Sequence, residues 1–380
     1  MLATSYRTAY NEDHEAFRDT VRKVFAEALT PHMDEHEANG IVPRDVWKKM
    51  GDAGMLCMTV KEENGGLGLD FGFNCVLTEE LSYLGSSAGF TLQNDITANY
   101  FERLGNPEQR AKYLPGMVSG DIITAIAMTE PGAGSDLQGI RTTARKDGNH
   151  LVINGSKTYI TNGQNADCVI VVAKTDPEKG AKGISLVLVD ADTPGFERGR
   201  NLDKIGQHAA DTSELFFNDC RVPMTNILGA EGMGFVHLME ELPQERLGIA
   251  VGAQAAAQRA FDEAVKFTKD RKAFGKTVFE FQNTKFTLAD LKAKLQVGWA
   301  HLDWAIRKHL AGELTTDEAS AAKLWHTDLQ WECCDTALQL HGGAGYMNEY
   351  AIARLWRDAR VTRIFGGTNE IMKEVISRSI

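Results

Sequence analysis

Cysteine is scarce in this 380-residue sequence, and none of its six cysteines forms a C-x-x-C pair. The adjacent pair Cys333-Cys334 is typical of small apolar core residues in a helix, and a reducing compartment is expected. The sequence also lacks any apolar run of about 18 residues, the length of a membrane-spanning helix. Its first residues show neither a secretory signal nor an Arg-rich transit peptide. We expect a bacterial cytoplasmic protein or, for a processed chain, a mitochondrial matrix protein.

Positive charge is also in short supply. The 41 lysines and arginines against 52 aspartates and glutamates give a formal net charge of −11. This balance argues against nonspecific binding to nucleic acid or to an anionic membrane, so an anionic ligand needs a local cluster of cations. The segment His32-Met-Asp-Glu-His36 matches the H-x-x-E-H zinc pattern. It lies in a polar, acidic stretch without a third ligand, and we expect no metal site.

The pattern of apolar residues changes twice along the chain, which is too long for one simple core. Residues 1–120 are predicted to form a helical domain. Residues 121–234 carry short β-branched runs separated by turn dipeptides, as in an antiparallel β domain. Residues 235–380 are helical again. The predicted fold class is α+β, in the order helices, strands, helices. The last part contains three long amphipathic segments, at 245–270, 281–311 and 317–340.

Two segments of the β region offer hydroxyl groups at strand ends. The segment 127–136 reads AMTEPGAGSD and follows the apolar run 122–127. Its glycines lack Cβ atoms where a flat polar ligand could come close, although a Pro-Gly turn between strands explains the same residues. Further on, Asn154-Gly155 predicts a hairpin turn whose second strand ends at Tyr159-Ile-Thr161. Thr129 and Thr161 are therefore candidate ligand contacts.

Glu245 is the candidate catalytic acid or base. It lies in Leu242-Pro-Gln-Glu-Arg-Leu247 and is predicted to open a long, Ala-rich helix, with Pro243 at an early helical position or a kink. An acid in the first turn of a helix is also what the helix dipole favours, so this position alone does not establish a function.

Three further segments combine glycines with cations or caps. Arg271-Lys-Ala-Phe-Gly-Lys276 suits a pyrophosphate and an adenine, although cations at a helix C-terminus need no ligand. Gln339-Leu-His-Gly-Gly-Ala-Gly345 offers either backbone N–H groups to a phosphate or a glycine C-cap. Ile364-Phe-Gly-Gly-Thr-Asn-Glu370 predicts a helix capped at Thr368 or Asn369, or an anion site at that helix end.

Taken in order, TEPGAGSD, YITNG, RKAFGK, QLHGGAGY and GGTNE resemble the acyl-CoA dehydrogenase family over essentially the whole chain. The resemblance implies a helical N-terminal domain, a middle β domain and a C-terminal four-helix bundle, assembled as a homotetramer with FAD. It also implies an acyl-CoA substrate in fatty acid β-oxidation and electron-transfer flavoprotein as electron acceptor.

The resemblance also implies roles for individual residues. Two sets would bind FAD: one lines the isoalloxazine ring or completes its site, and the other holds the pyrophosphate and adenosine, largely from a neighbouring subunit. The first set is Met128, Thr129, Ser135, Tyr159, Thr161, Thr368 and Glu370. The second set is Arg271, Phe274, Gln282, Gln339 and Gly343. Residues expected to contact the acyl-CoA substrate are Ser135, Gln244, Arg246, Gly366 and Gly367.

One position departs from the commonest family pattern. Many members carry the catalytic Glu directly before the Gly-Thr of the last motif, where this chain has Gly366. A minority place the base on the bundle helix, where this chain has Glu245. The sequence around Glu245 is similar to that of the long-chain members, and the isovaleryl members share the location of the base.

The implied reaction is the α,β-dehydrogenation of a medium-to-long-chain acyl-CoA to the trans-2-enoyl-CoA. Glu245 would remove the α-proton, FAD would take the β-hydride, and the Gly366 N–H would stabilise the developing enolate oxygen. Burial under the acyl chain is expected to raise the pKa of Glu245. A branched-chain acyl-CoA dehydrogenase, an oxygen-using acyl-CoA oxidase and a non-catalytic flavin- or CoA-binding scaffold are the alternatives.

Overall fold

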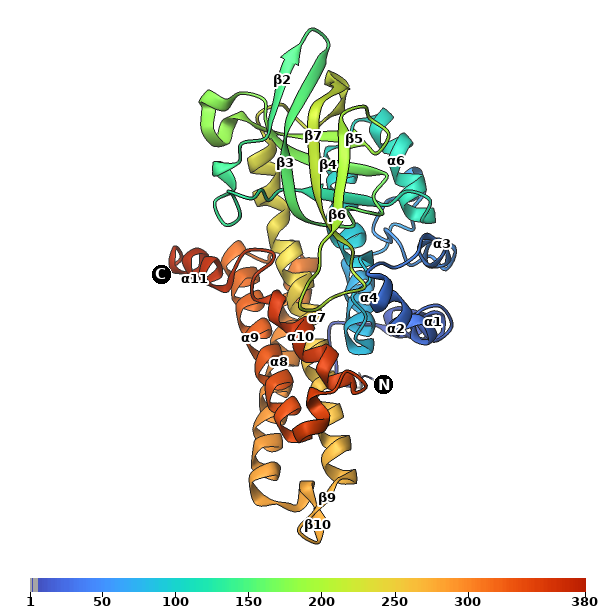
Figure 1. Ribbon diagram of the computed structural model, residues 1–380, viewed down its shortest axis with the longest axis vertical. Coiled ribbons are helices and arrows are strands. Elements are labelled where there is room, and N and C mark those ends of the chain that lie inside the picture. Colours follow the sequence, from blue (N-terminus) through green and yellow to red (C-terminus); the bar gives the residue numbers. More distant parts are fainter. Residues whose placement is uncertain (1, 3–5) are drawn as a thin grey trace.

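The computed structural model describes residue 2 and residues 6–380, and Figure 1 shows three parts. The N-terminal helices lie beside the upper half of a long helical bundle, and a β domain lies above both. No helix among the described residues is both long and apolar enough to cross a membrane. The N-terminal helices are α1 (Glu12–Ala28), α2 (Met33–Asn39), α3 (Arg44–Asp52), α4 (Phe71–Leu84), α5 (Ala98–Leu104) and α6 (Pro107–Ser119).

Local sequence explains where several of these helices begin. Asn11 caps α1 and Asn106 caps α6, each in a reciprocal capping box with the residue three positions on. Pro107 occupies the first helical position of α6, where a missing N–H costs nothing. Helix α4 is buried on most sides because it packs against both α1 and the bundle. A π-helical turn, η3 (Leu92–Thr97), leads directly into α5.

The β domain is one sheet, with strands in the order β6-β7-β3-β2-β4-β5-β8 and β1 paired to β4. Most neighbours are antiparallel, as predicted, but β1 and β4 run parallel, and so do β2 and β4 where they meet. The strands are β1 (Thr124–Ala127), β2 (Thr143–Asp147), β3 (His150–Thr161), β4 (Cys168–Lys174), β5 (Ile184–Asp190), β6 (Phe196–Asn201), β7 (Thr212–Pro223) and β8 (Ile227–Leu228).

The hairpin predicted at Asn154-Gly155 is wrong. Both residues lie inside the single long strand β3, and the hairpin turn falls earlier, between β2 and β3. Gly155 marks a bulge against β7, and a Cβ there would lie 2.4 Å from the Thr142 hydroxyl oxygen. Asn154 instead pairs with the side chain of Asp219 across the sheet. The glycine therefore serves a close approach of the backbone inside a strand.

The C-terminal part is built on the three long helices that the sequence predicts. They are α7 (Gly234–Asp270), α8 (Gln282–Leu310) and α9 (Thr316–His341), followed by α10 (Ala351–Thr362) and α11 (Asn369–Ser377). The short pair β9 (Lys272–Ala273) and β10 (Lys276–Thr277) joins α7 to α8 at the tip of the bundle (Figure 1). Helix α7 begins at Gly234 and continues through Pro243. Glu245 therefore lies inside the helix, and the expectation that it opens the helix is wrong.

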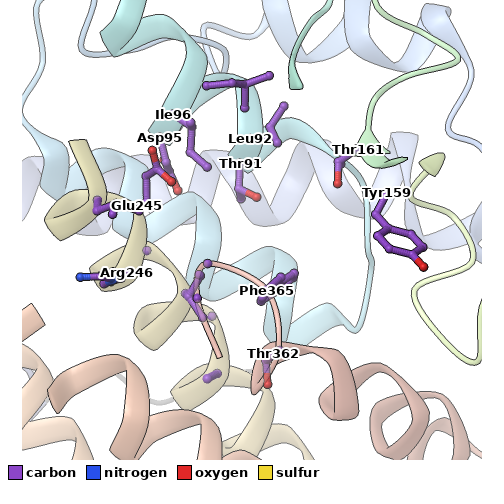
Figure 2. A pocket seen from close by; sticks show the side chains of 18 of the residues that line it. Thr91, Leu92, Asp95, Ile96, Tyr159, Thr161, Glu245, Arg246, Thr362 and Phe365 are labelled. Carbon is purple, nitrogen blue, oxygen red and sulfur yellow. The ribbon is translucent and has the colours of Figure 1, made fainter. Parts of the chain in front are cut away.

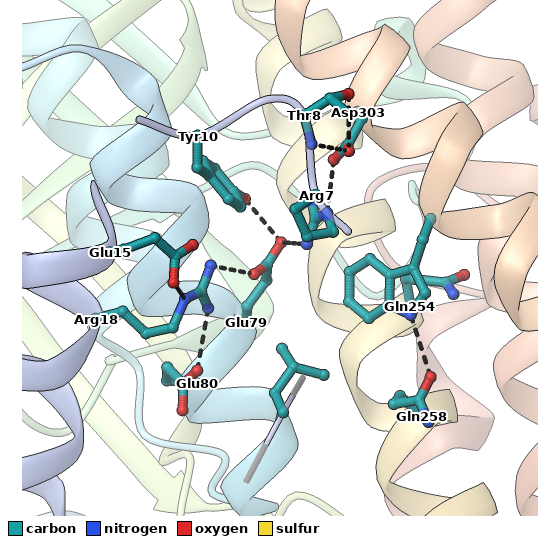
Figure 3. Close-up of polar contacts among 12 residues, drawn as sticks. Arg7, Thr8, Tyr10, Glu15, Arg18, Glu79, Glu80, Gln254, Gln258 and Asp303 are labelled. Atoms are coloured by element: carbon teal, nitrogen blue, oxygen red, sulfur yellow. Dashed lines mark hydrogen bonds and ion pairs between the residues drawn. The ribbon is translucent and has the colours of Figure 1, made fainter. Parts of the chain in front are cut away.

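Buried ion pairs join the N-terminal segment to the bundle (Figure 3). Arg7 donates to Glu79 on α4 at 2.5 Å and to Asp303 on α8 at 2.6 Å. Arg18 on α1 also contacts Glu79, and both arginine–glutamate pairs are almost fully buried. Burial alone would raise the pKa of Glu79, but the two guanidinium groups reverse the sign and lower it. Removal of one partner would leave an uncompensated buried charge, so these contacts fix the position of α4 against the bundle.

Candidate active site

A cavity of about 810 Å³ opens where the three parts of the molecule meet. Its walls come from α4 and η3, from the ends of β1 and β3, from α7, and from the loop after α10. Figure 2 shows part of this lining, with Asp95 from η3, Thr161 from β3, Glu245 from α7 and Phe365 from the loop after α10 among the labelled side chains. Segments more than 200 residues apart in sequence, such as Tyr159 and Gly366, therefore face one cavity.

The ends of β1 and β3 form one wall of the cavity. Met128, Thr129, Tyr159 and Thr161 all line it, as the sequence predicts for neighbouring strand ends. The Thr129 carbonyl accepts the Thr158 N–H at 2.9 Å, which holds the two strand ends together. Tyr159 is 71% exposed and has a φ of +61°, which is costly for an aromatic residue. The backbone thus presents an aromatic side chain to the solvent side of the cavity instead of packing it.

A buried ion pair behind this wall was not predicted from the sequence. The Lys157 ammonium group donates to Glu130 at 2.9 Å and to the Met128 carbonyl at 2.9 Å. Glu130 also accepts the backbone N–H groups of Arg141 and Thr142. Burial lowers the pKa of Lys157 to about 8, although Glu130 opposes the shift. These bonds fix the strand end at residues 128–130. In the sequence, the only sign of this ion pair is a lysine at a position of the strand pattern that should face inward.

Glu245 lies deep in the cavity, on the inner face of α7, and is 7% exposed. Burial raises the pKa of its carboxyl group to about 7. The Tyr100 hydroxyl donates to it at 3.2 Å and partly opposes the shift, whereas the nearby carboxylate of Glu241 adds to it. A carboxyl group with a pKa near neutrality can accept a proton at physiological pH. Tyr100, from α5, was not predicted as part of the site.

The loop after α10 forms the wall opposite the strand ends. Gly366 and Gly367 have φ of +63° and +88°, and both line the cavity. A Cβ at Gly366 would come within 2.3 Å of the Ile249 side chain on α7, so the loop approaches the helix closely. Lys323 on α9 donates to the Gly367 carbonyl and to the Asn369 side chain, each at 2.8 Å. This fully buried lysine, with its pKa lowered by burial to about 8, was also not predicted.

Other predicted site residues lie around the same cavity or just outside it. Ser135 lines its mouth and is exposed, and Arg246 lines it while donating to Ser320 at 3.1 Å. Thr368 caps α11 by accepting the Ile371 N–H, and Glu370 is exposed in the first turn of that helix. Gln244 does not line the cavity. Its amide donates to the Asp95 carbonyl at 2.8 Å and its oxygen lies 3.0 Å from the His309 ring.

The remaining predicted residues lie far from this cavity. Phe274 lies between β9 and β10, at the tip of the bundle away from the β domain (Figure 1), and its side chain is 95% exposed. None of this set lines the cavity of Glu245. All five members are exposed: Arg271, Phe274, Gln282, Gln339 and Gly343. The predicted site residues thus divide into two groups within one chain.

Comparison with known proteins gives consistent matches along the whole chain. Family models for the N-terminal, middle and C-terminal domains of acyl-CoA dehydrogenase match residues 11–121, 125–220 and 232–380. The chain is 48% identical to the mitochondrial long-chain specific acyl-CoA dehydrogenase of Sus scrofa over 377 residues, which cover 98% of this chain and 88% of that protein.

Solved structures show the same fold. An acyl-CoA dehydrogenase from Geobacillus kaustophilus matches with a TM-score of 0.97 and 49% identity, covering 98% of this chain and 99% of that chain. An acyl-CoA dehydrogenase from Bacillus anthracis, solved in complex with FAD, matches with a TM-score of 0.91 and 29% identity, covering 97% of this chain and 67% of that chain. The α+β fold with helical, β and helical parts, predicted from the sequence, is confirmed.

Proposed function

This chain belongs to the acyl-CoA dehydrogenase family and is an FAD-dependent oxidoreductase of the long-chain type, and from that premise we propose that Glu245 is the base that removes the α-proton of a medium-to-long-chain acyl-CoA. The observation that carries this proposal is the placement of Glu245. It is a buried carboxyl group with a pKa near 7, inside the cavity that the Gly366-Gly367 loop closes. With glycine at 366, Glu245 is the carboxylate that serves the reacting carbon.

The residues around the cavity fit a flavin. The Thr161 hydroxyl can donate to one edge of a planar ring, and the Thr129 hydroxyl, which donates to the Thr158 carbonyl, can accept a hydrogen bond there. The exposed Tyr159 offers an aromatic surface. On the opposite wall, Gly366 and Gly367 have no side chains to block a close approach. FAD, when bound there, supplies the acceptor for the hydride that leaves Cβ. The chain's own residues position the ring and separate it from solvent.

The proposed reaction needs one proton transfer and one stabilised oxygen. The Glu245 carboxylate accepts the Cα proton, and the electron pair of that C–H bond forms the α,β double bond as the hydride departs. Negative charge develops on the thioester oxygen, and the Gly366 N–H would donate to it. Lys323 holds the loop through the Gly367 carbonyl. Arg246, the next residue on α7, and Ser135 at the mouth of the cavity would contact the pantetheine arm.

A second copy of the chain would complete the cofactor site. The residues proposed for the pyrophosphate and adenosine lie at the tip of the bundle, apart from the cavity of Glu245. The bundle also exposes large apolar side chains on α8 and α9, including Phe286, Trp304 and Trp325. We therefore infer a homotetramer in which one subunit lends its tip to the cavity of another. Electron-transfer flavoprotein is the proposed electron acceptor. All six cysteines are unpaired and buried, which supports a reducing compartment.

Anaerobic flavin bleaching tests the proposal. Acyl-CoAs of increasing length, and some branched ones, are added to the FAD-loaded protein while the flavin absorbance is followed. We expect medium and long straight chains to bleach the flavin, and Glu245→Gln to slow bleaching by at least about a hundredfold, the scale of a lost general base. Glu240→Gln, at a half-exposed acid on the same helix, is the matched control and should bleach normally.

Other outcomes point to the alternatives. Full bleaching by Glu245→Gln would reject Glu245 as the base. Stoichiometric hydrogen peroxide in air, without an electron-transfer partner, would indicate an oxidase. Failure of every acyl-CoA to bleach a flavin-loaded wild-type protein would support a binding scaffold.

A further inference from the structure

Asp95 is a second buried acid in the cavity, and the proposed reaction gives it no role. It lies in the π-helical turn η3 between α4 and α5, and it is only 5% exposed. It lines the same cavity as Glu245, and Figure 2 shows the two side chains on adjoining walls. Single π-helical turns within helices are frequent at functional sites. The placement of this acid therefore calls for an explanation beyond packing.

The carboxyl group of Asp95 lacks the partners that a buried acid normally has. Its Oδ1 atom has no hydrogen bond of normal geometry among the described residues, and its Oδ2 atom receives a long bond of 3.5 Å from the Thr78 hydroxyl. The Asn74 side chain is the other polar group that acts on this carboxyl group. Burial raises its pKa to about 8, and hydrogen bonding from Asn74 and Thr78 lowers it only in part. No cation contributes to this balance. At neutral pH the group is therefore protonated and can donate a hydrogen bond.

The surrounding helices hold Asp95 at a defined distance from the base. Gln244, the residue before Glu245, donates its amide to the Asp95 carbonyl at 2.8 Å and is itself held by His309. On α7, a Cβ at Gly248 would lie 3.1 Å from the Asp95 carboxylate. Gly248 follows Glu245 by three residues, which is about 4.5 Å along a helix axis. Asp95 therefore meets α7 nearly one turn away from the base, within the same cavity.

A second unsatisfied polar atom lines the same cavity. The Ser87 hydroxyl lines the cavity and has no hydrogen-bond partner among the described residues. Ser82 also lines it, and a Cβ at Gly252 would come within 2.9 Å of its hydroxyl oxygen. A plain hydrocarbon chain would leave the polar atoms of Asp95 and Ser87 unsatisfied. Burying such a group without a partner weakens binding of the plain chain.

We propose that Asp95 is a specificity-determining residue that hydrogen-bonds an oxygen atom on the acyl chain, so that the preferred substrates are acyl-CoA thioesters bearing a hydroxyl or keto group beyond the β-carbon. This inference deepens the proposed function and rests on the binding of an acyl-CoA in this cavity. Asp95 selects the chain and takes no part in proton removal, because its carboxyl group reaches α7 a turn away from Glu245. Sites built to bond a substrate hydroxyl discriminate strongly against analogues that lack it.

Binding measurements with matched thioesters test the inference separately from catalysis. Dodecanoyl-CoA and its monohydroxy derivatives, with the hydroxyl moved along the chain, are titrated calorimetrically into the FAD-loaded Glu245→Gln variant, which prevents turnover. We expect one hydroxyl position to lower Kd at least about tenfold relative to the plain chain, the gain from one satisfied buried group. Adding Asp95→Leu should abolish this preference and tighten binding of the plain chain. Asp95→Asn, which keeps a donor, should retain part of it.

Two results would overturn the inference. One is that no hydroxyl position binds better than the plain chain, which would mean that water satisfies Asp95. The other is that the preference survives in the Asp95→Leu background. Asp52→Leu, at an exposed acid on α3, controls for the loss of an acid. If Asp95→Leu does not retain FAD, the inference is judged from two other titrations. These are the hydroxyl scan in the Glu245→Gln variant, which keeps Asp95, and the same scan in the variant that also carries Asp95→Asn. Flavin bleaching of the wild type reports on the proposed function independently.

Discussion

Glu245 and Lys323 lie on adjacent helices of the bundle, and burial moves the pKa of each toward neutrality. The pKa of Glu245 rises to about 7 and that of Lys323 falls to about 8, in both cases mainly because the side chain is removed from water. Neither forms an ion pair with an opposite charge among the described residues. Glu245 can therefore exchange a proton, and Lys323 keeps its donors directed at backbone and amide oxygens. Removal from water, more than charge pairing, therefore shifts the pKa values of these two side chains toward neutrality.

The pH dependence of flavin reduction should report the titration of Glu245. The base acts only when ionised, and its folded-state pKa is raised to about 7, so kcat/KM should increase as pH rises through that value and then level off. Tyr100→Phe removes a hydrogen bond that favours the ionised form, so the rising limb should move to higher pH. Stopped-flow bleaching between about pH 5 and pH 9 measures both profiles. A rate that is already flat from pH 5 would contradict the assignment.

Sequence reasoning predicted Glu245 but could not predict its neighbours. The base was recognised because its segment resembles a family pattern, and Gly366 removed the usual alternative. Tyr100 and Asp95 come from the N-terminal helices, about 150 positions earlier in the chain. Their roles follow only from how η3 and α5 pack against α7. No periodicity within either segment marks a residue as facing a cavity formed by another domain.

At the scale of elements, the loop at Gly366-Gly367 depends on α9 for its position. Lys323→Met should leave the Gly367 carbonyl and the Asn369 side chain without their donor. We expect kcat to fall at least about tenfold with little change in KM, because a displaced donor weakens the transition state more than the ground state. Steady-state kinetics with an artificial electron acceptor measure this split.

A control separates positioning from general damage to the bundle. Lys308 pairs with Glu318 between α8 and α9 at 2.5 Å, outside the cavity, so Lys308→Met should leave kcat unchanged. Equal loss of activity and of bound FAD in Lys323→Met would instead indicate a purely structural role for that lysine.

Element boundaries show where local signals mislead. The predicted β-branched runs of the middle region do form strands. Strand β1 lies within the run 122–127, and β4 and β5 are buried along nearly their whole length, as continuous apolar runs allow. Asn154-Gly155 gave a hairpin signal that the long pairing of β3 with β7 overrides. Pro243 suggested a helix start, but α7 continues through it from Gly234. Contacts with residues distant in sequence determine where these elements begin and end, and a window of a few residues contains no information about those contacts.

At the scale of the whole molecule, the predicted FAD residues form two separate groups, and we predict that a complete site combines residues from two subunits. One group surrounds the cavity of Glu245, and the other lies at the tip of the bundle around Arg271. If a second subunit supplies the tip, each complete site takes Glu245 from one chain and Arg271 from another. Glu245→Gln and Arg271→Glu, each purified alone, should then both be inactive, the second through weak FAD binding.

Co-expression of the two variants with different tags tests this arrangement. In a pair formed by one chain of each kind, one of the two sites combines both defects and the other contains neither. Random pairing should therefore restore about a quarter of wild-type activity, since half of the pairs are mixed and half of their sites are intact. Doubly tagged oligomers should be the active fraction. Mixed oligomers that form but remain inactive would show that Glu245 and Arg271 act within the same chain.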